Sequence, residues 1–471
     1  MSNKVYVFSV GGTGLRIMKS IMMLLAAGMD AKGFEVVPII VDPHIDLSER
    51  TRLSNLVDEY INIFNRTIQG EDEKNKENPL NGFFKTKVTW WKDLNGQMND
   101  TSSDRGIRKS FGEYLNVGNL ESNDINQYLI QTLFSEKNLD NSISVGFKGN
   151  PNVGTVVLGD EIRGGDWFNA LKNSFNDGDR IFIISSIFGG TGASGYPLLE
   201  KLVRECEGYP NIQKCPMAAI TVFPYFALDD PSLTNSSIDS TNFITKTKSA
   251  LSYYENHVLS DYLYYIGEVN PKAVYKNNEE EQEDYTHFIE VVAATALFDF
   301  LGRGKPDNGT QYMSRAIKEN VDSLDILSLG DAYKPLVKSI TDMKLLHTLA
   351  TFIENENHFP LRKTHHKLNK DFYKDRSFTD LMRFLDRFDK WYSELVRNNR
   401  SFSPLNEGYL ENGKSDMVKG ITLDADGKEY YILQLLNEAI GDSGQKHQIK
   451  LRYLLDYAYK AINHYTNKIL K

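Results

Sequence analysis

Two glycine-rich segments are the residues of this chain best suited to binding a phosphate group. The first is Gly11, Gly12, Thr13 and Gly14, and the second is Gly189, Gly190, Thr191, Gly192, Ala193, Ser194 and Gly195. Each follows an apolar run and precedes a helix-like stretch. Glycine lets the backbone turn tightly and approach an anion, and a helix N-terminus supplies unpaired N–H groups at the positive end of its dipole. Both segments are therefore predicted to bind phosphate, and the hydroxyls of Thr191 and Ser194 are predicted to assist.

The residues after the glycines narrow the type of phosphate loop. Neither segment ends in the Gly-Lys-Ser/Thr of a P-loop. The turn at Gly12 to Gly14, with Asp42 after the next strand, could belong to a dinucleotide-dependent oxidoreductase. That turn lacks the third glycine of the fingerprint, Asp42 lies beyond the usual spacing of roughly 20 residues, and the loop at 189–195 stays unexplained. The oxidoreductase is thus the less favoured hypothesis.

The elements around these loops indicate an α/β fold. Val/Ile-rich runs predict strands at 4–10, 35–41, 181–187, 217–225 and 262–266, with a weaker signal at 155–158, and helices fall between them. Continuous apolar strands are typical of a parallel sheet covered on both faces, so we expect a doubly wound, mostly parallel sheet. Ligands bind at the carboxyl ends of such strands, where the two glycine loops can face each other.

The domain organisation follows from where the pattern changes. We expect a nucleotide-binding domain over 1–303, with an elaboration at about 69–152 and a core helix at about 286–302. From Tyr333 onward the periodicity is helical, which predicts a mainly helical C-terminal domain over 304–471.

Composition excludes several classes of protein. The chain has 471 residues, enough for two or three domains, and a net charge of −9, which argues against a general nucleic-acid binder. Only two cysteines occur, Cys206 and Cys215, as expected in a reducing cytoplasm. The N-terminus has no signal-peptide pattern, and the apolar stretch at 17–29 is too short to span a bilayer. We expect a cytoplasmic protein without direct membrane insertion.

The loop pair resembles the tubulin and FtsZ superfamily, whose signature loop is Gly-Gly-Gly-Thr-Gly followed by small residues. Residues 189–197 are similar to the FtsZ form, including the proline Pro197, and residues 10–14 occupy the place of the first phosphate loop. Asp42 lies where the family has an Asn-Thr-Asp turn, and residues 149–154 look like its Gly-x-Pro-x-x-Gly segment. The likeness covers about residues 4–303 and looks closest to divergent bacterial tubulin-like proteins.

This resemblance implies GTP or GDP with Mg²⁺, held at the carboxyl ends of the strands. Family members usually read the guanine edge with an asparagine on the core helix, and this helix has none. Asp284 could accept hydrogen bonds from the guanine, and His287 or Glu290 could assist. The choice between guanine and adenine therefore stays open.

The resemblance also implies slow GTP hydrolysis completed by an adjacent subunit in a head-to-tail filament or oligomer. Asn320, Asp322 and Asp325 have the Asn-x-Asp-x-x-Asp spacing of the FtsZ catalytic loop, and carboxylates there would orient or deprotonate water and help hold the metal. However, residues 302–319 separate them from the core helix, and 323–327 could equally be a strand. The alternative is a non-polymerising scaffold or switch that binds a protein partner through its C-terminal helices.

Overall fold

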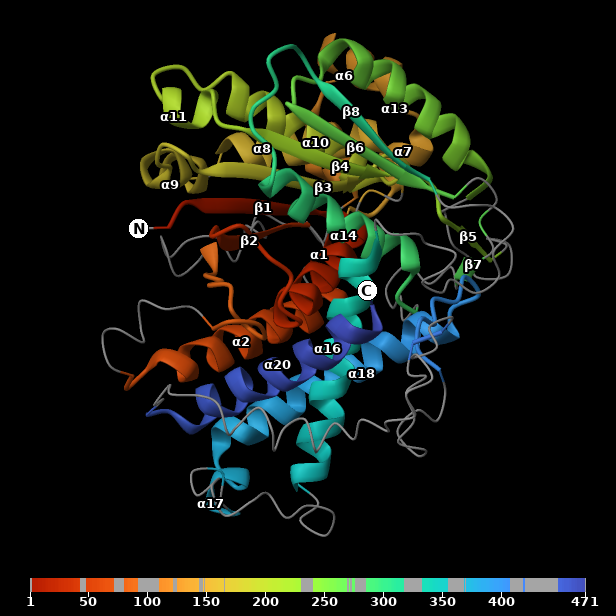
Figure 1. Ribbon diagram of the computed structural model, residues 1–471. Coiled ribbons are helices and arrows are strands. Elements are labelled where there is room, and N and C mark those ends of the chain that lie inside the picture. The colour runs from red at the N-terminus through yellow and green to blue at the C-terminus, as the bar shows by residue number, and fades with distance from the viewer. Residues whose placement is uncertain are drawn as a thin grey trace.

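The structure is a computed structural model of the chain (Figure 1). It describes residues 2–42, 48–71, 80–91, 110–121, 125–143, 147, 149–164, 166–229, 240–268, 271, 273–275, 285–316, 333–354, 368, 370–406, 418–419 and 448–470.

A six-stranded parallel sheet forms the centre of the molecule, in the order β2-β1-β3-β4-β6-β8. Its strands are β1 (Lys4–Val10), β2 (Glu35–Val41), β3 (Arg180–Ser186), β4 (Met217–Val222), β6 (Tyr262–Gly267) and β8 (Gln311–Ala316). Two short strands, β5 (Phe226–Leu228) and β7 (Ala273–Tyr275), pair separately. The predicted parallel α/β class is confirmed. The sheet continues past residue 303, where the sequence pattern placed the end of the nucleotide-binding domain, because β8 pairs with β6.

Helices cover both faces of the sheet, because alternate residues of each strand point to opposite sides. In β1, Val5 and Val7 belong to one hydrophobic cluster, whereas Tyr6 and Phe8 belong to the other. The first face is covered by α1 (Gly11–Ala26), α2 (Ser48–Ile68) and α14 (Phe288–Leu301). The second is covered by α8 (Pro151–Gly164), α9 (Trp167–Ser174), α10 (Gly190–Arg204), α11 (Pro210–Gln213) and α13 (Phe243–His257). The core is therefore doubly wound.

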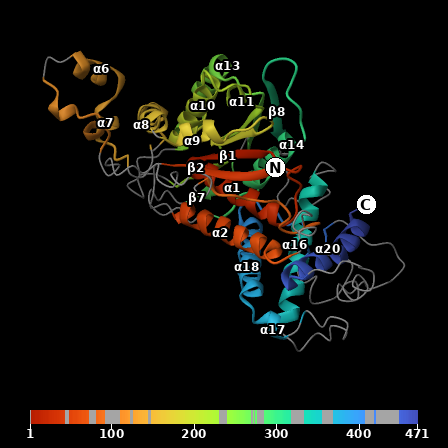
Figure 2. The ribbon, with the colours of Figure 1, turned by 90° about the vertical axis from the view of Figure 1, so that its left-hand side faces the viewer.

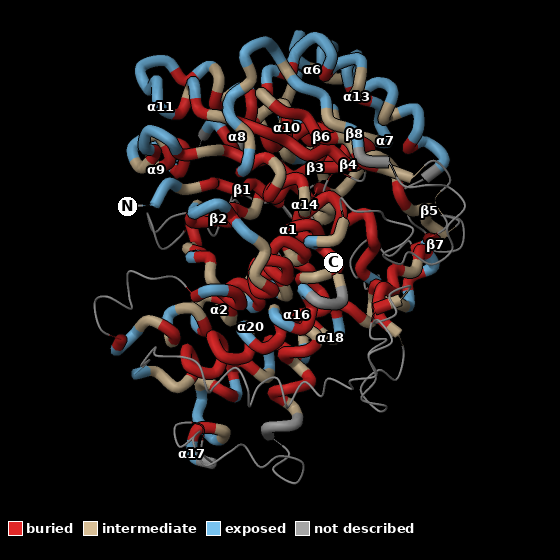
Figure 3. The backbone as a smooth tube through the Cα atoms, in the orientation of Figure 1, coloured by how far each residue is buried: buried red, intermediate tan, exposed pale blue. Residues whose placement is uncertain are grey.

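The C-terminal region adds a further layer of helices outside α1 and α2 (Figure 1). It consists of α16 (Lys334–Glu354), α17 (Lys370–Tyr373), α18 (Arg376–Arg397) and α20 (Lys450–Ile469). The inward faces of these helices are buried (Figure 3) and share one hydrophobic cluster with α1 and β1. The predicted helical region is confirmed, and it is packed directly on the α/β layer.

Residues between β2 and β3 form a helical elaboration. It contains α5 (Phe111–Tyr114), the 3₁₀ turn η1 (Val117–Asn119), α6 (Ile125–Leu133) and α7 (Glu136–Asp140), and a second 3₁₀ turn, η2 (Ser240–Asn242), precedes α13. The strand expected at 155–158 is wrong, because these residues lie inside α8. Figure 2 shows α6 and α7 standing away from the rest of the molecule. In the described part of the chain, the helices are too short or too polar to cross a bilayer.

Candidate phosphate-binding site

Both glycine loops are the first turns of helices. Helix α1 begins at Gly11, directly after β1, and α10 begins at Gly190, shortly after β3. Within the described residues, no side chain caps either N-terminus, and neither first turn contains an acidic residue. The free N–H groups of both helices and their positive dipole ends are therefore available to an anion.

The two N-termini lie against each other at the carboxyl edge of the sheet. Strands β1 and β3 are neighbours in register, with Ser9 opposite Ile184. Gly11 has a φ of +72°, and a β-carbon added to it would lie 3.2 Å from Thr191 Cβ and 3.5 Å from Gly192 N. The structure thus brings together the two segments that the sequence predicted to face each other.

The glycines of the two loops differ in how closely neighbouring atoms approach them. A β-carbon at Gly192 would lie 2.6 Å from both N and O of Ser186, and one at Gly14 would lie 2.8 Å from the carbonyl carbon of Ser9. These two glycines let α10 and α1 pack directly on their strands. At Gly12, in contrast, an added β-carbon would meet none of the described atoms within 4 Å. Of the residues that the structure describes, none therefore packs against this position.

The residues of the two glycine loops differ in how exposed they are to solvent. Gly12, Thr13 and Gly189 are half-buried, whereas the loop from Gly190 to Gly195 is buried. The Ser194 hydroxyl donates to the Gly190 carbonyl oxygen at 2.8 Å and lies against Gly154 of α8. Ser194 thus supports the close packing of α8 and α10.

Asp42 follows β2 at the same edge of the sheet. The preceding residue, Val41, lies opposite Val10, so Asp42 is next to the first loop. Its side chain is buried, and its carbonyl oxygen accepts a hydrogen bond from Arg50 at 3.4 Å.

Lys246 is a residue near the site that the sequence did not indicate. A β-carbon at Gly149, which has a φ of +73°, would lie 2.7 Å from Lys246 Nζ, and one at Gly190 would lie 3.2 Å from Gly149 N. The ammonium group of α13 is therefore placed beside the second loop. The sequence carries no signal for this, because a lysine in the first turn of a distant helix looks like an ordinary surface residue.

His287 caps the core helix. Its Nδ1 accepts a hydrogen bond from the Ile289 N–H at 3.0 Å, and Glu290 accepts one from the His287 N–H at 3.1 Å. Burial, reinforced by Arg16 and Arg400, lowers the pKa of the imidazole to about 3. His287 is therefore neutral and fully buried at the N-terminus of α14. Asp284, Asn320, Asp322 and Asp325 lie outside the described residues.

A buried ion pair ties the first loop's helix to the core helix. Arg16 Nε lies 2.6 Å from Glu290 Oε1, and the Tyr225 hydroxyl donates to the same oxygen at 2.9 Å. Burial and the Glu290 carboxylate raise the pKa of Tyr225 well above its ordinary value, so this phenol stays protonated. The N-terminal halves of α1 and α14 are thus fixed relative to each other.

Polar contacts continue from these helices into the C-terminal region. Lys19 of α1 lies 3.3 Å from Glu394 of α18, which also accepts a hydrogen bond from the Thr286 hydroxyl at 2.7 Å. The Asn398 amide donates to the carbonyl oxygen of Tyr285 at 3.3 Å. The segment that starts the core helix is therefore held by both parts of the chain.

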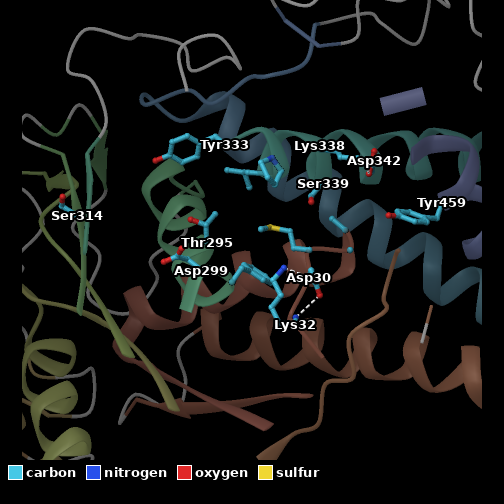
Figure 4. A pocket seen from close by; sticks show the side chains of 16 residues that line it. Asp30, Lys32, Thr295, Asp299, Ser314, Tyr333, Lys338, Ser339, Asp342 and Tyr459 are labelled. Atoms are coloured by element: carbon cyan, nitrogen blue, oxygen red, sulfur yellow. Dashed lines mark hydrogen bonds and ion pairs between the residues drawn. The ribbon is translucent and has the colours of Figure 1, made fainter. Parts of the chain in front are cut away.

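A separate pocket of about 670 Å³ lies at the opposite end of α1 and α14 (Figure 4). Its wall includes Asp30 and Lys32, which pair at 3.1 Å, and Lys338 and Asp342, which also pair. Asp299, which also lines the pocket, accepts hydrogen bonds from Arg303 Nε at 2.7 Å and Arg303 Nη2 at 3.0 Å. The charged side chains of this pocket are thus paired, and the pocket lies apart from the phosphate loops.

No group of three or more metal-binding side chains occurs among the residues that the structure describes. The two uncapped N-termini fit the phosphates themselves.

No family model and no curated protein matches this chain. Among solved structures it is similar to a helical model of the TubZ-Bt two-stranded filament, with 15% identity, a TM-score of 0.25 and coverage of 83% of this chain and 79% of that one. It is also similar to a GTPγS-form protofilament of Bacillus thuringiensis serovar israelensis TubZ, with 12% identity, a TM-score of 0.23 and coverage of 83% and 80%. Overlays with TM-scores this low do not establish a common fold.

Proposed function

We propose that this protein is a tubulin-like GTP-binding protein that holds the phosphates of its nucleotide between the N-termini of α1 and α10. The observation that carries the proposal is the convergence of two uncapped helix N-termini, at Gly11 and Gly190, on the carboxyl edge of a parallel sheet. One such terminus is a common anion site, and two in contact suit a chain of phosphates.

Specific groups would share the binding. Backbone N–H groups of Gly12 and Thr13 on one side, and of Gly190 and Thr191 on the other, would donate to phosphate oxygens. The Lys246 ammonium lies where it would neutralise charge at the second loop. When bound, Mg²⁺ would neutralise phosphate charge and polarise the phosphorus–oxygen bonds.

Base recognition is assigned to Asp284 by the resemblance alone. A carboxylate accepts hydrogen bonds from the N1–H and amino group of guanine, whereas adenine offers no N1–H donor. His287 is left out of this assignment, because its Nδ1 is used as a helix cap and the ring is fully buried.

Assembly is proposed to be head to tail, with slow GTP hydrolysis completed between copies. Helices α1 and α14 carry the chain from the carboxyl edge of the sheet to its amino edge, and these two edges face opposite sides of the molecule (Figure 1). Asn320, Asp322 and Asp325 of one copy would orient the attacking water at the nucleotide of the next.

A second candidate function is a nucleotide-dependent switch without a polymer. It is favoured by the contacts of Lys19 and Thr286 with Glu394, which connect the helices of the site to α18. A shift of α1 on nucleotide binding would then reach the C-terminal helices, where a protein partner could read it.

The first experiment is to release and identify by mass spectrometry the nucleotide carried by the purified protein, and to compare thermal shifts with GTP, ATP and NAD. We expect a guanosine phosphate and a shift with GTP. An adenosine phosphate would overturn the base assignment, and a response only to NAD would overturn the proposed function. Light scattering with GTP and Mg²⁺ then separates the polymer from the switch, because only the polymer gives a nucleotide-dependent rise in particle size.

A further inference from the structure

Helices α8 and α13 bring further positive groups to the second glycine loop. Helix α8 begins at Pro151, directly after Gly149 and Asn150. A β-carbon added to Gly190 would lie 3.0 Å from Asn150 N and 3.2 Å from Gly149 N, so the N-terminus of α8 lies against that of α10. Helix α13 supplies Lys246, whose Nζ would lie 2.7 Å from a β-carbon at Gly149. Two positive dipole ends and an ammonium group thus meet at this loop.

Several contacts fix the position of Lys246 relative to the loop. Helix α13 packs on α10, and its Tyr254 hydroxyl donates to the carbonyl oxygen of Ala193, within the loop, at 3.2 Å. At the start of α13, the centre of the Phe243 ring lies 4.8 Å from that of Phe188, which directly precedes the loop. Phe243 and Tyr254 are buried, whereas Lys246 is half-buried. The side chain of Lys246 therefore extends from a helix that is held to the loop on both sides of it.

The base of the proposed nucleotide belongs at the other side of the sheet edge. Asp284, to which base recognition is assigned, directly precedes Tyr285 in the chain, and the Tyr285 carbonyl oxygen accepts a hydrogen bond from Arg16 of α1 at 2.8 Å. Helices α1 and α14 cover the first face of the sheet, whereas α8, α10 and α13 cover the second. A nucleotide with its base beside α14 would therefore extend its phosphates across the edge toward α8 and α13. The terminal phosphate would then be the one nearest Lys246.

We propose that Lys246 binds the terminal phosphate of the nucleotide and makes the site selective for a nucleoside triphosphate over the diphosphate. This inference rests on the proposed function and adds to it the phosphate that each part of the site binds. Gly12 and Thr13 of the first loop bind the phosphates nearer the ribose. A diphosphate ends one group short of Lys246 and gains little from its charge.

The chemistry of the terminal phosphate explains why an ammonium group matters at this position. A terminal phosphate group carries close to two negative charges at neutral pH, more than an inner phosphate of the same chain. Backbone N–H groups supply only partial charges, whereas Lys246 supplies a full one, and hydrogen bonds between ions are about twice as strong as neutral ones. Hydrolysis would remove the anion that these positive groups share. The site therefore distinguishes the nucleotide before hydrolysis from the nucleotide after it.

Titrations with two nucleotides test this selectivity. We expect wild type to bind GTPγS more tightly than GDP in excess Mg²⁺, at a protein concentration low enough to avoid assembly. Lys246→Met, which keeps an apolar stem, should weaken GTPγS binding by about ten- to a hundredfold through loss of a charged hydrogen bond. GDP binding should change by less than about twofold. The preference for GTPγS should thus fall at least about fivefold.

Lys248→Met is the matched control, because it removes the same charge from the same helix. Lys248 is exposed, and residues two apart on a helix face different sides. This variant should bind both nucleotides as wild type does. Circular dichroism and urea unfolding verify that both variants are folded.

The outcomes separate this inference from the proposed function. Equal weakening of GTPγS and GDP would give Lys246 an inner phosphate or a structural role, and no weakening of either would remove it from the site. Each of these results overturns the inference and leaves the proposed function standing. A wild type that binds neither nucleotide overturns the proposed function and this inference with it.

The dependence of affinity on salt gives an independent measurement. Added NaCl screens the attraction between an ammonium group and a phosphate. We expect Lys246→Met to reduce the salt dependence of GTPγS binding and to leave that of GDP binding unchanged. A structural role of Lys246 would not alter the salt dependence of one nucleotide alone, so identical slopes in wild type and variant contradict the proposal.

Discussion

Replacing Gly12 by alanine should separate phosphate binding from folding. Among the described atoms, none lies within 4 Å of the β-carbon that this change adds. Alanine loses less backbone entropy than glycine when a helix forms, so the free energy of unfolding should rise by about 0.4 to 1 kcal/mol. The same methyl group would stand where a phosphate approaches the N–H groups of α1.

The loss of GTP-binding free energy can be calculated from the interaction of an anion with a helix N-terminus. An anion at a helix N-terminus gains up to about 2 kcal/mol in a partly buried site. If the methyl group displaces the phosphate from α1 alone, GTP should bind about tenfold or more weakly, since 1.4 kcal/mol corresponds to a factor of ten. Urea unfolding gives the first quantity, and isothermal titration with GTP gives the second.

Gly192→Ala provides the matched contrast. Its β-carbon would lie 2.6 Å from the backbone N and O of Ser186, so helix α10 would have to move off β3. We expect a loss of about 1 to 3 kcal/mol in stability from this overpacking. Unchanged GTP affinity in a folded Gly12→Ala protein would refute the placement of the phosphate, and destabilisation by Gly12→Ala would refute the open space at this position.

Three further changes test the surroundings of the site. Lys246→Ala should weaken GTP binding by about ten- to a hundredfold through loss of a charged hydrogen bond, whereas Lys248→Ala on the same helix, measured in the same titration, should have no effect. Glu290→Gln should cost about 3 to 5 kcal/mol in urea unfolding, because it removes the carboxylate that pairs with the buried Arg16 at 2.6 Å; a loss below 1 kcal/mol would contradict this. Burial lowers the pKa of His287 to about 3 in the folded protein, so as the pH falls the unfolded chain is protonated at this residue before the folded protein is. Stability should therefore fall as the pH drops below about 6.5. Between pH 6.5 and 5 this amounts to about 2 kcal/mol, and His287→Asn, which retains a capping side chain, should remove that part of the slope; an unchanged slope would contradict it.

Much of the α/β layer was predictable because its signals are local. Strands β1 and β2 have the predicted bounds, since continuous apolar runs between turns leave little choice. The approach of the two glycine loops follows from parallel strands that end at one edge. The strand predicted at 155–158 is wrong because a short Val-rich run looks the same in a strand and in a buried helix. Here the run lies in α8, which packs on α10.

The remaining features depend on contacts that are distant in the chain. The pairing of Arg16 with Glu290 and the placement of Lys246 beside Gly149 join residues on different helices, and sequence spacing does not encode such pairs. Strand β8 was not predicted, because its own residues carry little strand signal. As an edge strand with an exposed Tyr312, it lacks the continuous apolar run of its neighbours.

The shared hydrophobic cluster of the sheet and the C-terminal helices has a consequence for biosynthesis. Val7 of β1 and Leu454 of α20 belong to the same core. At about 5 to 20 residues per second, a ribosome would release α20 roughly 20 to 90 s after β1. During that interval the apolar faces of α16 and α2 that α20 covers stay exposed to solvent. The nascent chain is therefore expected to depend on chaperones until α20 emerges.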